Sequence, residues 1–175
     1  MPDSLAKQFN AEGVQFSMQQ NLLVIEVENR FATAKITNHG ASVLSYVPKQ
    51  GPSAETDLLW VSDQAVFDGS KPVRGGIPVC WPWFGKAEDP ELPAHGFVRN
   101  RVWQVEQVSN LENGVTEVVL STHSDDASLA IWPHAFDLTL RVEIGEKLTM
   151  TLISHNPNAY DISITEAFHS YFNVA

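Results

Sequence analysis

The fold is decided by the stretch FDLTLRVEIGEKLTMTLI, residues Phe136–Ile153. Apolar and polar residues alternate almost perfectly along Phe136–Ile144 and alternate again along Lys147–Ile153. Such alternation is typical of strands with one buried face, because successive side chains of a strand point to opposite faces. Gly145-Glu146, between the two runs, is typical of a tight turn. The sequence therefore predicts an antiparallel hairpin at this place.

Similar strand patterns recur on the N-terminal side of this hairpin. Asn113-Gly114 marks a turn between two of them, and no segment shows the sustained apolar spacing of three and four residues that a helix requires. Short, regularly spaced strands separated by turns are typical of a sandwich or a large twisted antiparallel sheet, so we expect an all-β fold. The further predicted strands are Leu22–Glu28, Phe31–Thr37, Ser42–Val47, Asp57–Val61, Val102–Val108 and Val115–Thr122.

Length, charge and cysteine content narrow the class of protein. A chain of 175 residues suits one ordinary domain, and an apolar fraction of 43% suffices for a real core. The formal net charge of −10 repels a phosphate backbone and an anionic lipid surface, so we expect no nucleic-acid partner and no membrane partner. The one cysteine, Cys80, the lack of a signal-peptide-like N-terminus and the lack of a long apolar run favour a cytoplasmic protein.

One segment, Asp68–Asn100, interrupts the strand pattern. It is rich in Gly, Pro and Trp and is too long for a plain hairpin connection. Long ordered loops on a β scaffold often carry functional sites. Basic residues are concentrated here, which favours an anion site but also suits a solvated loop balanced by Glu88, Asp89 and Glu91. Five of the chain's eleven basic residues lie in or beside this loop, namely Lys71, Arg74, Lys86, Arg99 and Arg101.

Within the loop, RGGIPVCWPWFG (Arg74–Gly85) combines groups that suit a carbohydrate. Sugars present C–H faces that pack on aromatic rings, and their hydroxyls need polar partners such as an arginine. The two adjacent glycines permit a turn or a close approach to a ligand. The alternative is that the tryptophans are core residues, and for at least one of them burial is the better interpretation. We expect Cys80 to be a buried small hydrophobe rather than a nucleophile.

Two of the six histidines stand out. His95 lies in LPAHGFVRN, four residues before Arg99, and His169 lies in EAFHSYF among aromatic residues. A histidine among aromatic residues is more often a core residue than a catalyst, so spacing alone leaves both interpretations open. The sequence lacks the metal-binding patterns His-x-His and H-E-x-x-H, and Glu166 would lie on the opposite face of a strand from His169, so we expect no metal. Surface or turn roles are expected for His39, His123, His134 and His155.

The motifs together resemble the aldose 1-epimerase (mutarotase) superfamily. RGGIPVCWPWFG followed by LPAHGFVRN is similar to the glucose-6-phosphate 1-epimerase branch, and DLLWVSDQAVF (residues 57–67) and TEAFHSYF (residues 165–172) fit the same pattern. The resemblance runs from about residue 20 to the last residue. It implies a large antiparallel β-sandwich of the galactose mutarotase type. It further implies that residues 1–175 form a single domain, the N-terminal portion of a fold that is incomplete at its C-terminus.

The resemblance also implies roles for four residues. Arg74 and Arg99 would hold the substrate, His169 would be the catalytic acid, and His95 would act near the reacting carbon. The implied reaction interconverts the α and β anomers of a hexose 6-phosphate by ring opening and reclosure, which needs an acid and a base but no cofactor. The family's base and a sugar-holding Asp lie downstream of the matched motifs. Neither is assigned here, so we expect the 175-residue chain alone to be inactive.

Other functions remain open at this point. The chain is also compatible with a non-catalytic carbohydrate-binding module, with a mutarotase of non-phosphorylated aldoses, or with a metal-dependent isomerase. The expected partner is a small-molecule sugar phosphate. A strand expected over Thr165–Phe172 would be an unpaired edge, and unpaired edges favour association with another chain.

Overall fold

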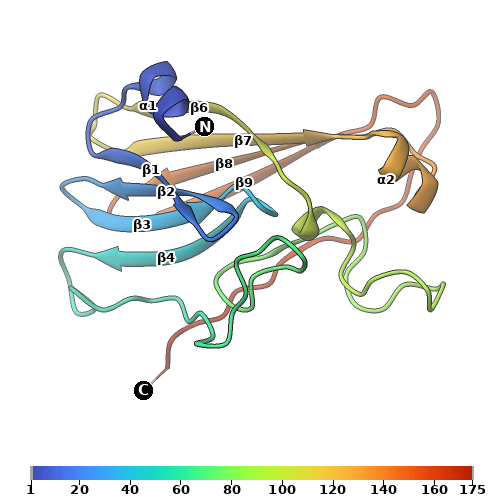
Figure 1. Cartoon of the computed structure of the whole chain (residues 1–175), viewed down its shortest axis with the longest axis horizontal. Coiled ribbons are helices and arrows are strands. Elements are labelled where there is room, and N and C mark those ends of the chain that lie inside the picture. Colours follow the sequence, from blue (N-terminus) through green and yellow to red (C-terminus); the bar gives the residue numbers. More distant parts are fainter. Residues whose placement is uncertain (1, 175) are drawn as a thin grey trace.

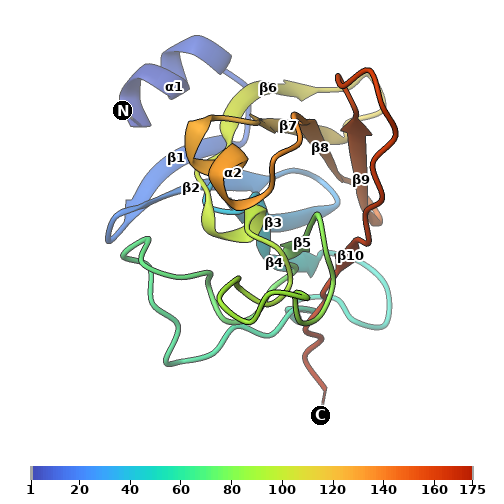
Figure 2. The same ribbon diagram turned by 90° about the vertical axis from the view of Figure 1, so that its right-hand side faces the viewer.

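The computed structural model describes residues 2–174. Two four-stranded antiparallel sheets lie face to face, as Figure 1 and Figure 2 show. The first sheet has the order β1 (Val14–Gln19), β2 (Leu22–Glu28), β3 (Ala32–Thr37) and β4 (Ser42–Pro48). The second has the order β6 (Gln104–Asn110), β7 (Thr116–His123), β8 (Asp137–Ile144) and β9 (Leu148–His155). The expected all-β antiparallel architecture is confirmed.

The hairpin predicted from alternation is β8–β9, in which Ile144 faces Leu148 across the turn. The alternate residues of β8 point into the core, so Leu140 and Val142 are fully buried while the residues between them are not. The Tyr46 hydroxyl donates a hydrogen bond of 2.9 Å to the Gly145 carbonyl, which ties this turn to the first sheet. Each fully buried aliphatic side chain stabilises the sandwich by about 1.5–3 kcal/mol.

Most of the other predicted strands are confirmed to within two residues at each end. The exception is Asp57–Val61, which forms only isolated bridges, from Leu59 to Phe172 and from Val61 to Gly75. The Asp57 carboxylate accepts hydrogen bonds from the backbone N–H groups of Tyr46 and Leu59, both at 3.0 Å. A side chain that binds backbone groups in this way competes with strand pairing. Strand β1 was not predicted.

Two short α-helices were not expected. Helix α1 (Pro2–Phe9) packs on β1, where the Phe9 and Phe16 rings lie 6.1 Å apart. Helix α2 (Asp126–Ile131) begins with a capping box, in which Asp125 and Ser128 satisfy each other's backbone N–H groups. Helices this short carry too few residues for a periodic pattern. No helix within residues 2–174 is long and apolar enough to cross a membrane.

The long loop and the end of the chain meet below β4 (Figure 1). Here β5 (Val79–Cys80) pairs with β10 (Ala167–Phe168). The strand expected over Thr165–Phe172 is therefore wrong in length, because only two of its residues form a strand and Phe172 adds one bridge. The LPAHGFVRN motif (Leu92–Asn100), called here the second motif, ends in a 3₁₀ turn, η1 (Val98–Asn100), that leads toward β6.

Candidate functional site

The C-terminal segment lies between the long loop on one side and the segment Asp57–Val61 on the other. On one side, the backbone N–H groups of His169 and Tyr171 donate to the carbonyls of Pro78 and Gly76, at 3.0 and 2.9 Å. On the other side, the Trp60 N–H donates to the Tyr171 carbonyl at 2.9 Å. Backbone hydrogen bonds on both sides fix the position of His169 in the middle of a packed layer.

Two glycines, Gly75 and Gly76, make this layer possible. They belong to RGGIPVCWPWFG (Arg74–Gly85), called here the first motif. A Cβ on Gly75 would lie 2.4 Å from the Trp60 carbonyl oxygen, and one on Gly76 would lie 2.3 Å from that of Val43. Both distances are shorter than real Cβ contacts, and both glycines have positive φ. The two glycines thus allow the chain to pack closely on its own backbone. These contacts give no support to the interpretation that the glycines let a ligand approach.

The second motif packs on the opposite edge of the Val79–Gly85 stretch. The Phe97 N–H donates to the Trp81 carbonyl at 3.2 Å, and the His95 N–H donates to the Gly85 carbonyl at 2.6 Å. A Cβ on Gly96 would lie 1.8 Å from the Trp81 carbonyl oxygen, so only glycine permits this contact. Both predicted histidines therefore flank one short stretch of backbone, although they are far apart in sequence.

The structure brings His95 and His169 together. Their ring centroids lie 5.4 Å apart and the rings are nearly perpendicular. Phe84 contacts both rings, with centroid distances of 4.9 Å to His95 and 6.2 Å to His169. The Tyr171 ring stacks on the His169 ring, with the two centroids 4.8 Å apart. No hydrogen bond occupies the His169 ring nitrogens within the described part of the chain, so they are available to a ligand.

His95 is held in one defined state. Its φ of 66° is uncommon for a residue with a Cβ and costs on the order of 1 kcal/mol. Its Nδ1 accepts a hydrogen bond of 3.2 Å from the Gly85 N–H, so the neutral ring carries its proton on Nε2. Burial lowers the His95 pKa, and the positive charges of Arg99 and His169 lower it further. His95 is thus a neutral Nε2–H donor near pH 7.

The two predicted arginines differ in their surroundings. Arg99 donates a hydrogen bond of 2.8 Å to the Ala94 carbonyl, beside His95. Arg74 is exposed, and its guanidinium has no hydrogen-bond or ion-pair partner within residues 2–174. Of the five basic residues around the loop, Arg101 alone is paired with a carboxylate among the described residues, with Asp125 at 2.8 Å. The structure thus brings Arg99 next to His95 and shows no contact between Arg74 and either histidine.

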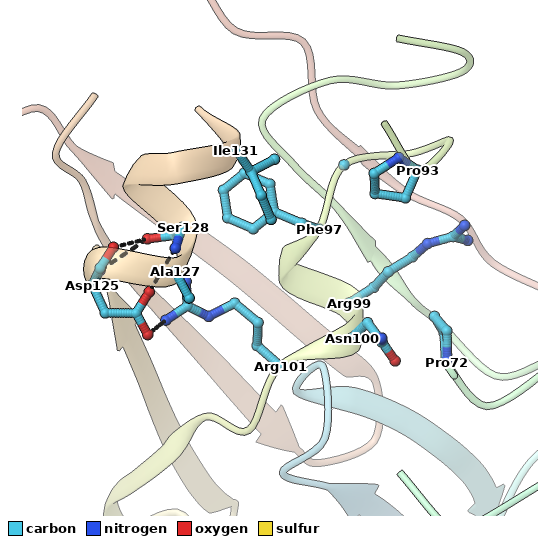
Figure 3. A pocket seen from close by; sticks show the side chains of 11 residues that line it. Pro72, Pro93, Phe97, Arg99, Asn100, Arg101, Asp125, Ala127, Ser128 and Ile131 are labelled. Carbon is cyan, nitrogen blue, oxygen red and sulfur yellow. Dashed lines mark hydrogen bonds and ion pairs between the residues drawn. The ribbon is translucent and has the colours of Figure 1, made fainter. Parts of the chain in front are cut away.

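A cavity of about 340 Å³ lies beside the second motif, between η1 and α2 (Figure 3). Figure 3 shows the guanidiniums of two lining arginines pointing in opposite directions, Arg101 toward Asp125 and Arg99 away from α2. Phe97 and Ile131 form an apolar part of the cavity wall. His95 and His169 do not line this cavity, so it adjoins the histidine pair and does not contain it.

The aromatic residues of the first motif divide between core and surface. Trp81 is 1% exposed and packs against Phe136, which confirms that at least one tryptophan is a core residue. Phe84 is 49% exposed and can offer a flat apolar face to a ligand. Cys80 is fully buried and burial raises its thiol pKa, as expected for a small core residue.

His39 was assigned a surface or turn role, and the surface part of that assignment is wrong. His39 lies in the turn between β3 and β4 but is only 4% exposed. Its Nε2 lies 3.1 Å from the Asn100 Oδ1, which joins it to the residue after Arg99. The backbone of the same turn also binds the residue after Asn100, since the Gly40 N–H donates to the Arg101 carbonyl at 2.6 Å. The sequence carries no local signal for this contact, because the partners are 61 residues apart.

The histidine pair has no acidic partner among the described residues. Within residues 2–174, no carboxylate forms a hydrogen bond or an ion pair with His95 or His169. In the same part of the chain, no group of three or more His, Cys, Asp and Glu side chains is placed to hold a metal ion. The site is therefore a pair of imidazoles with an adjacent cation.

Sequence comparison places these features among known proteins. The aldose 1-epimerase family model matches residues 23–175. A Salmonella typhimurium protein named "Putative glucose-6-phosphate 1-epimerase" is 36% identical over 154 residues, covering 88% of this chain and 49% of that protein. An Escherichia coli K12 protein of the same name is 36% identical over 151 residues, covering 86% and 48%. The chain spans about half the length of the curated relatives it matches.

Solved structures agree with the sequence comparison. The structure of a Salmonella typhimurium protein named "putative mutarotase (YeaD)" superposes with a TM-score of 0.82 at 32% identity, covering 92% of this chain and 52% of that one. A galactose mutarotase-like protein from Lactobacillus casei superposes with a TM-score of 0.66 at 21% identity and supports the fold alone. On the family match and these relatives, this chain belongs to the aldose 1-epimerase family.

Proposed function

We propose that this chain serves the interconversion of the α and β anomers of a hexose 6-phosphate, with glucose 6-phosphate as the substrate. The observation that carries the proposal is the pair of imidazoles 5.4 Å apart, with the Arg99 guanidinium beside them and unpaired with any carboxylate of residues 2–174. Acid–base groups and an anion-binding group are the parts that this reaction needs. The names of the curated relatives support the same substrate.

Mutarotation needs two proton transfers and no net change in the sugar. The ring C–O bond breaks as the ring oxygen gains a proton and the anomeric hydroxyl loses one, which gives the open-chain aldehyde. Rotation about the adjacent C–C bond and the reverse transfers then close the ring on the other face. The His169 ring nitrogens have no hydrogen-bond partner among residues 2–174, and His169 supplies the proton to the ring oxygen. The His95 Nε2–H donates a hydrogen bond to the developing carbonyl oxygen.

Two arginines and one exposed aromatic ring hold the substrate. Arg99 and Arg74 bind the 6-phosphate, because a guanidinium forms bidentate, charge-assisted hydrogen bonds with phosphate oxygens. Phe84 packs on the C–H face of the sugar next to both imidazoles. Anchoring the phosphate orients the reacting carbon without touching it.

The base is the part that the site lacks within the described residues, because no carboxylate contacts either imidazole there. This observation favours a second candidate, a carbohydrate-binding module that holds the sugar phosphate without catalysis. We therefore expect residues 1–175 alone to bind glucose 6-phosphate and to exchange its anomers slowly.

Two-dimensional exchange NMR on glucose 6-phosphate and on glucose separates these functions. Binding of glucose 6-phosphate in preference to glucose, with anomer exchange faster than in buffer, supports the mutarotase. Binding without faster exchange supports the binding module. Equal affinity for glucose and glucose 6-phosphate contradicts the role of the 6-phosphate, and binding of neither sugar contradicts both candidates.

A further inference from the structure

Phe84 contacts both imidazoles although it is 49% exposed. Its ring centroid lies 4.9 Å from that of His95 and 6.2 Å from that of His169. Exposed side chains change rotamer within picoseconds to nanoseconds unless their surroundings restrain them. The position of this ring therefore depends on how firmly the backbone at residue 84 is held.

Thr165 holds that backbone at two points. Its Oγ1 accepts a hydrogen bond of 2.9 Å from the Phe84 N–H, and its own N–H donates to the Pro82 carbonyl at 3.0 Å. The indole N–H of Trp83, which lies between these two residues, donates to the Pro93 carbonyl at 2.9 Å. Of the two bonds made by Thr165, only the one to Phe84 depends on the side chain, so a substitution at residue 165 can remove it alone.

The segment that carries Thr165 also carries His169. This segment binds the Pro78–Phe84 stretch at both ends. At one end the His169 N–H donates to the Pro78 carbonyl at 3.0 Å, and at the other the Thr165 hydroxyl accepts from Phe84. The pairing of β10 with β5 lies between these two contacts. The Thr165 hydroxyl therefore sets the Phe84 ring in register with the His169 imidazole.

We propose that Thr165 is a positioning residue, whose hydroxyl holds the Phe84 ring beside both imidazoles, where the ring packs on the C–H face of a bound sugar. The contact with the sugar rests on the proposed function, whereas the position of the ring does not. Thr165 is exposed, so water can replace its hydroxyl as the acceptor for the Phe84 N–H. Loss of the hydroxyl should therefore release the ring without unfolding the chain, which distinguishes positioning from support of the fold.

NMR spectra of the chain test the position of the ring, because an aromatic ring shifts the resonances of protons close to it. Thr165→Val removes the hydroxyl and keeps the shape of the side chain. We expect it to move the His95 and His169 imidazole resonances in the direction that Phe84→Leu moves them, since both changes reduce the time that the ring spends there. Thr165→Ser keeps the hydroxyl and should leave these resonances in place.

Thr151→Val is the matched control. Thr151 is an exposed residue of β9 whose hydroxyl has no hydrogen-bond partner within residues 2–174, so its replacement should move neither imidazole. Unmoved imidazole resonances in Thr165→Val, or equal movement in Thr151→Val, would overturn the proposal. It would also be overturned if Thr165→Val failed to fold while Thr165→Ser folded, because the hydroxyl would then support the fold.

Isothermal titration with glucose 6-phosphate and with inorganic phosphate tests the contact with the sugar, because inorganic phosphate has no C–H face. Thr165→Val should weaken binding of glucose 6-phosphate by roughly 3- to 10-fold, the range for one aromatic contact, and leave binding of inorganic phosphate unchanged. Thr165→Ser should restore the affinity. Equal losses for the two ligands, or no loss for glucose 6-phosphate, would refute the positioning role. If the unmodified chain bound both ligands equally while Thr165→Val still moved the imidazole resonances, the proposed function would fail and the placement of Phe84 by Thr165 would be supported.

Discussion

Replacement of Arg99 by Gln tests the anion site at the residue that the structure places beside His95. The substitution removes a guanidinium that is unpaired with any carboxylate of residues 2–174 and donates to the Ala94 carbonyl at 2.8 Å. A charge-assisted contact with phosphate contributes about 1.5–3 kcal/mol, which corresponds to a loss of roughly 10- to 150-fold in affinity for glucose 6-phosphate. Because Arg99 is partly exposed, we expect the lower part of this range. Affinity for glucose should change little.

The same substitution has a second expected effect, on the ionisation of His95. The Arg99 charge lowers the His95 pKa, although burial is the larger cause, so Arg99→Gln should raise that pKa without restoring its ordinary value. Isothermal titration with the two sugars and an NMR pH titration of the His95 ring measure the two effects.

Arg101→Gln is the matched control for Arg99. The Arg101 charge is already paired with Asp125, so its loss should leave glucose 6-phosphate binding nearly unchanged. If Arg99→Gln weakened glucose and glucose 6-phosphate equally, Arg99 would support the local fold rather than the phosphate. An unchanged affinity for glucose 6-phosphate would refute the anion site.

Three further predictions concern the histidines. In a protein with the complete site, His169→Asn should lower the anomer exchange rate by roughly 10²-fold or more, measured by exchange NMR, while full activity would remove His169 from the mechanism. Because the folded-state pKa of His95 is lowered, its contribution to stability is present above the unfolded pKa of about 6.5 and is lost as the pH falls below it. Urea unfolding between pH 5 and 8 should therefore depend less on pH in His95→Asn, and an unchanged pH dependence would contradict the pKa shift. His39→Ala should weaken glucose 6-phosphate binding more than glucose binding, because the side-chain oxygen Oδ1 of Asn100 loses its donor. His39→Gln keeps an amide donor and should restore binding. Equal binding by both variants would limit His39 to a structural role.

The sandwich could be predicted where the sequence alternates. Strands β8 and β9 follow directly from one face in the core and one in solvent, and the Gly145-Glu146 turn fixes their pairing. The segment Asp57–Val61 has similar composition, but the Asp57 side chain binds the backbone and prevents a strand. Helix α2 depends on a capping box, whose effect is local and independent of apolar periodicity.

The candidate site was predictable only in its parts. His95, His169 and Arg99 were singled out by motif, but the proximity of the two histidines arises from backbone hydrogen bonds to the Pro78–Gly85 stretch between them, which no spacing in the sequence encodes. The buried His39 could not be found from sequence, because its partner belongs to a distant loop. Burial of a polar ring is a property of the folded layers, and local composition does not reveal it.

The proposed function requires that the two imidazoles and Arg99 form one sugar-phosphate site. The most direct test is an NMR titration of residues 1–175, with the imidazole resonances assigned by His95→Asn and His169→Asn, against glucose 6-phosphate and against inorganic phosphate. We predict that glucose 6-phosphate shifts the His95 and His169 resonances together with one saturation curve and leaves His155, which is paired with Asp137 on the surface, unshifted. Saturable shifts confined to other histidines, or no saturable shift at all, would contradict the claim.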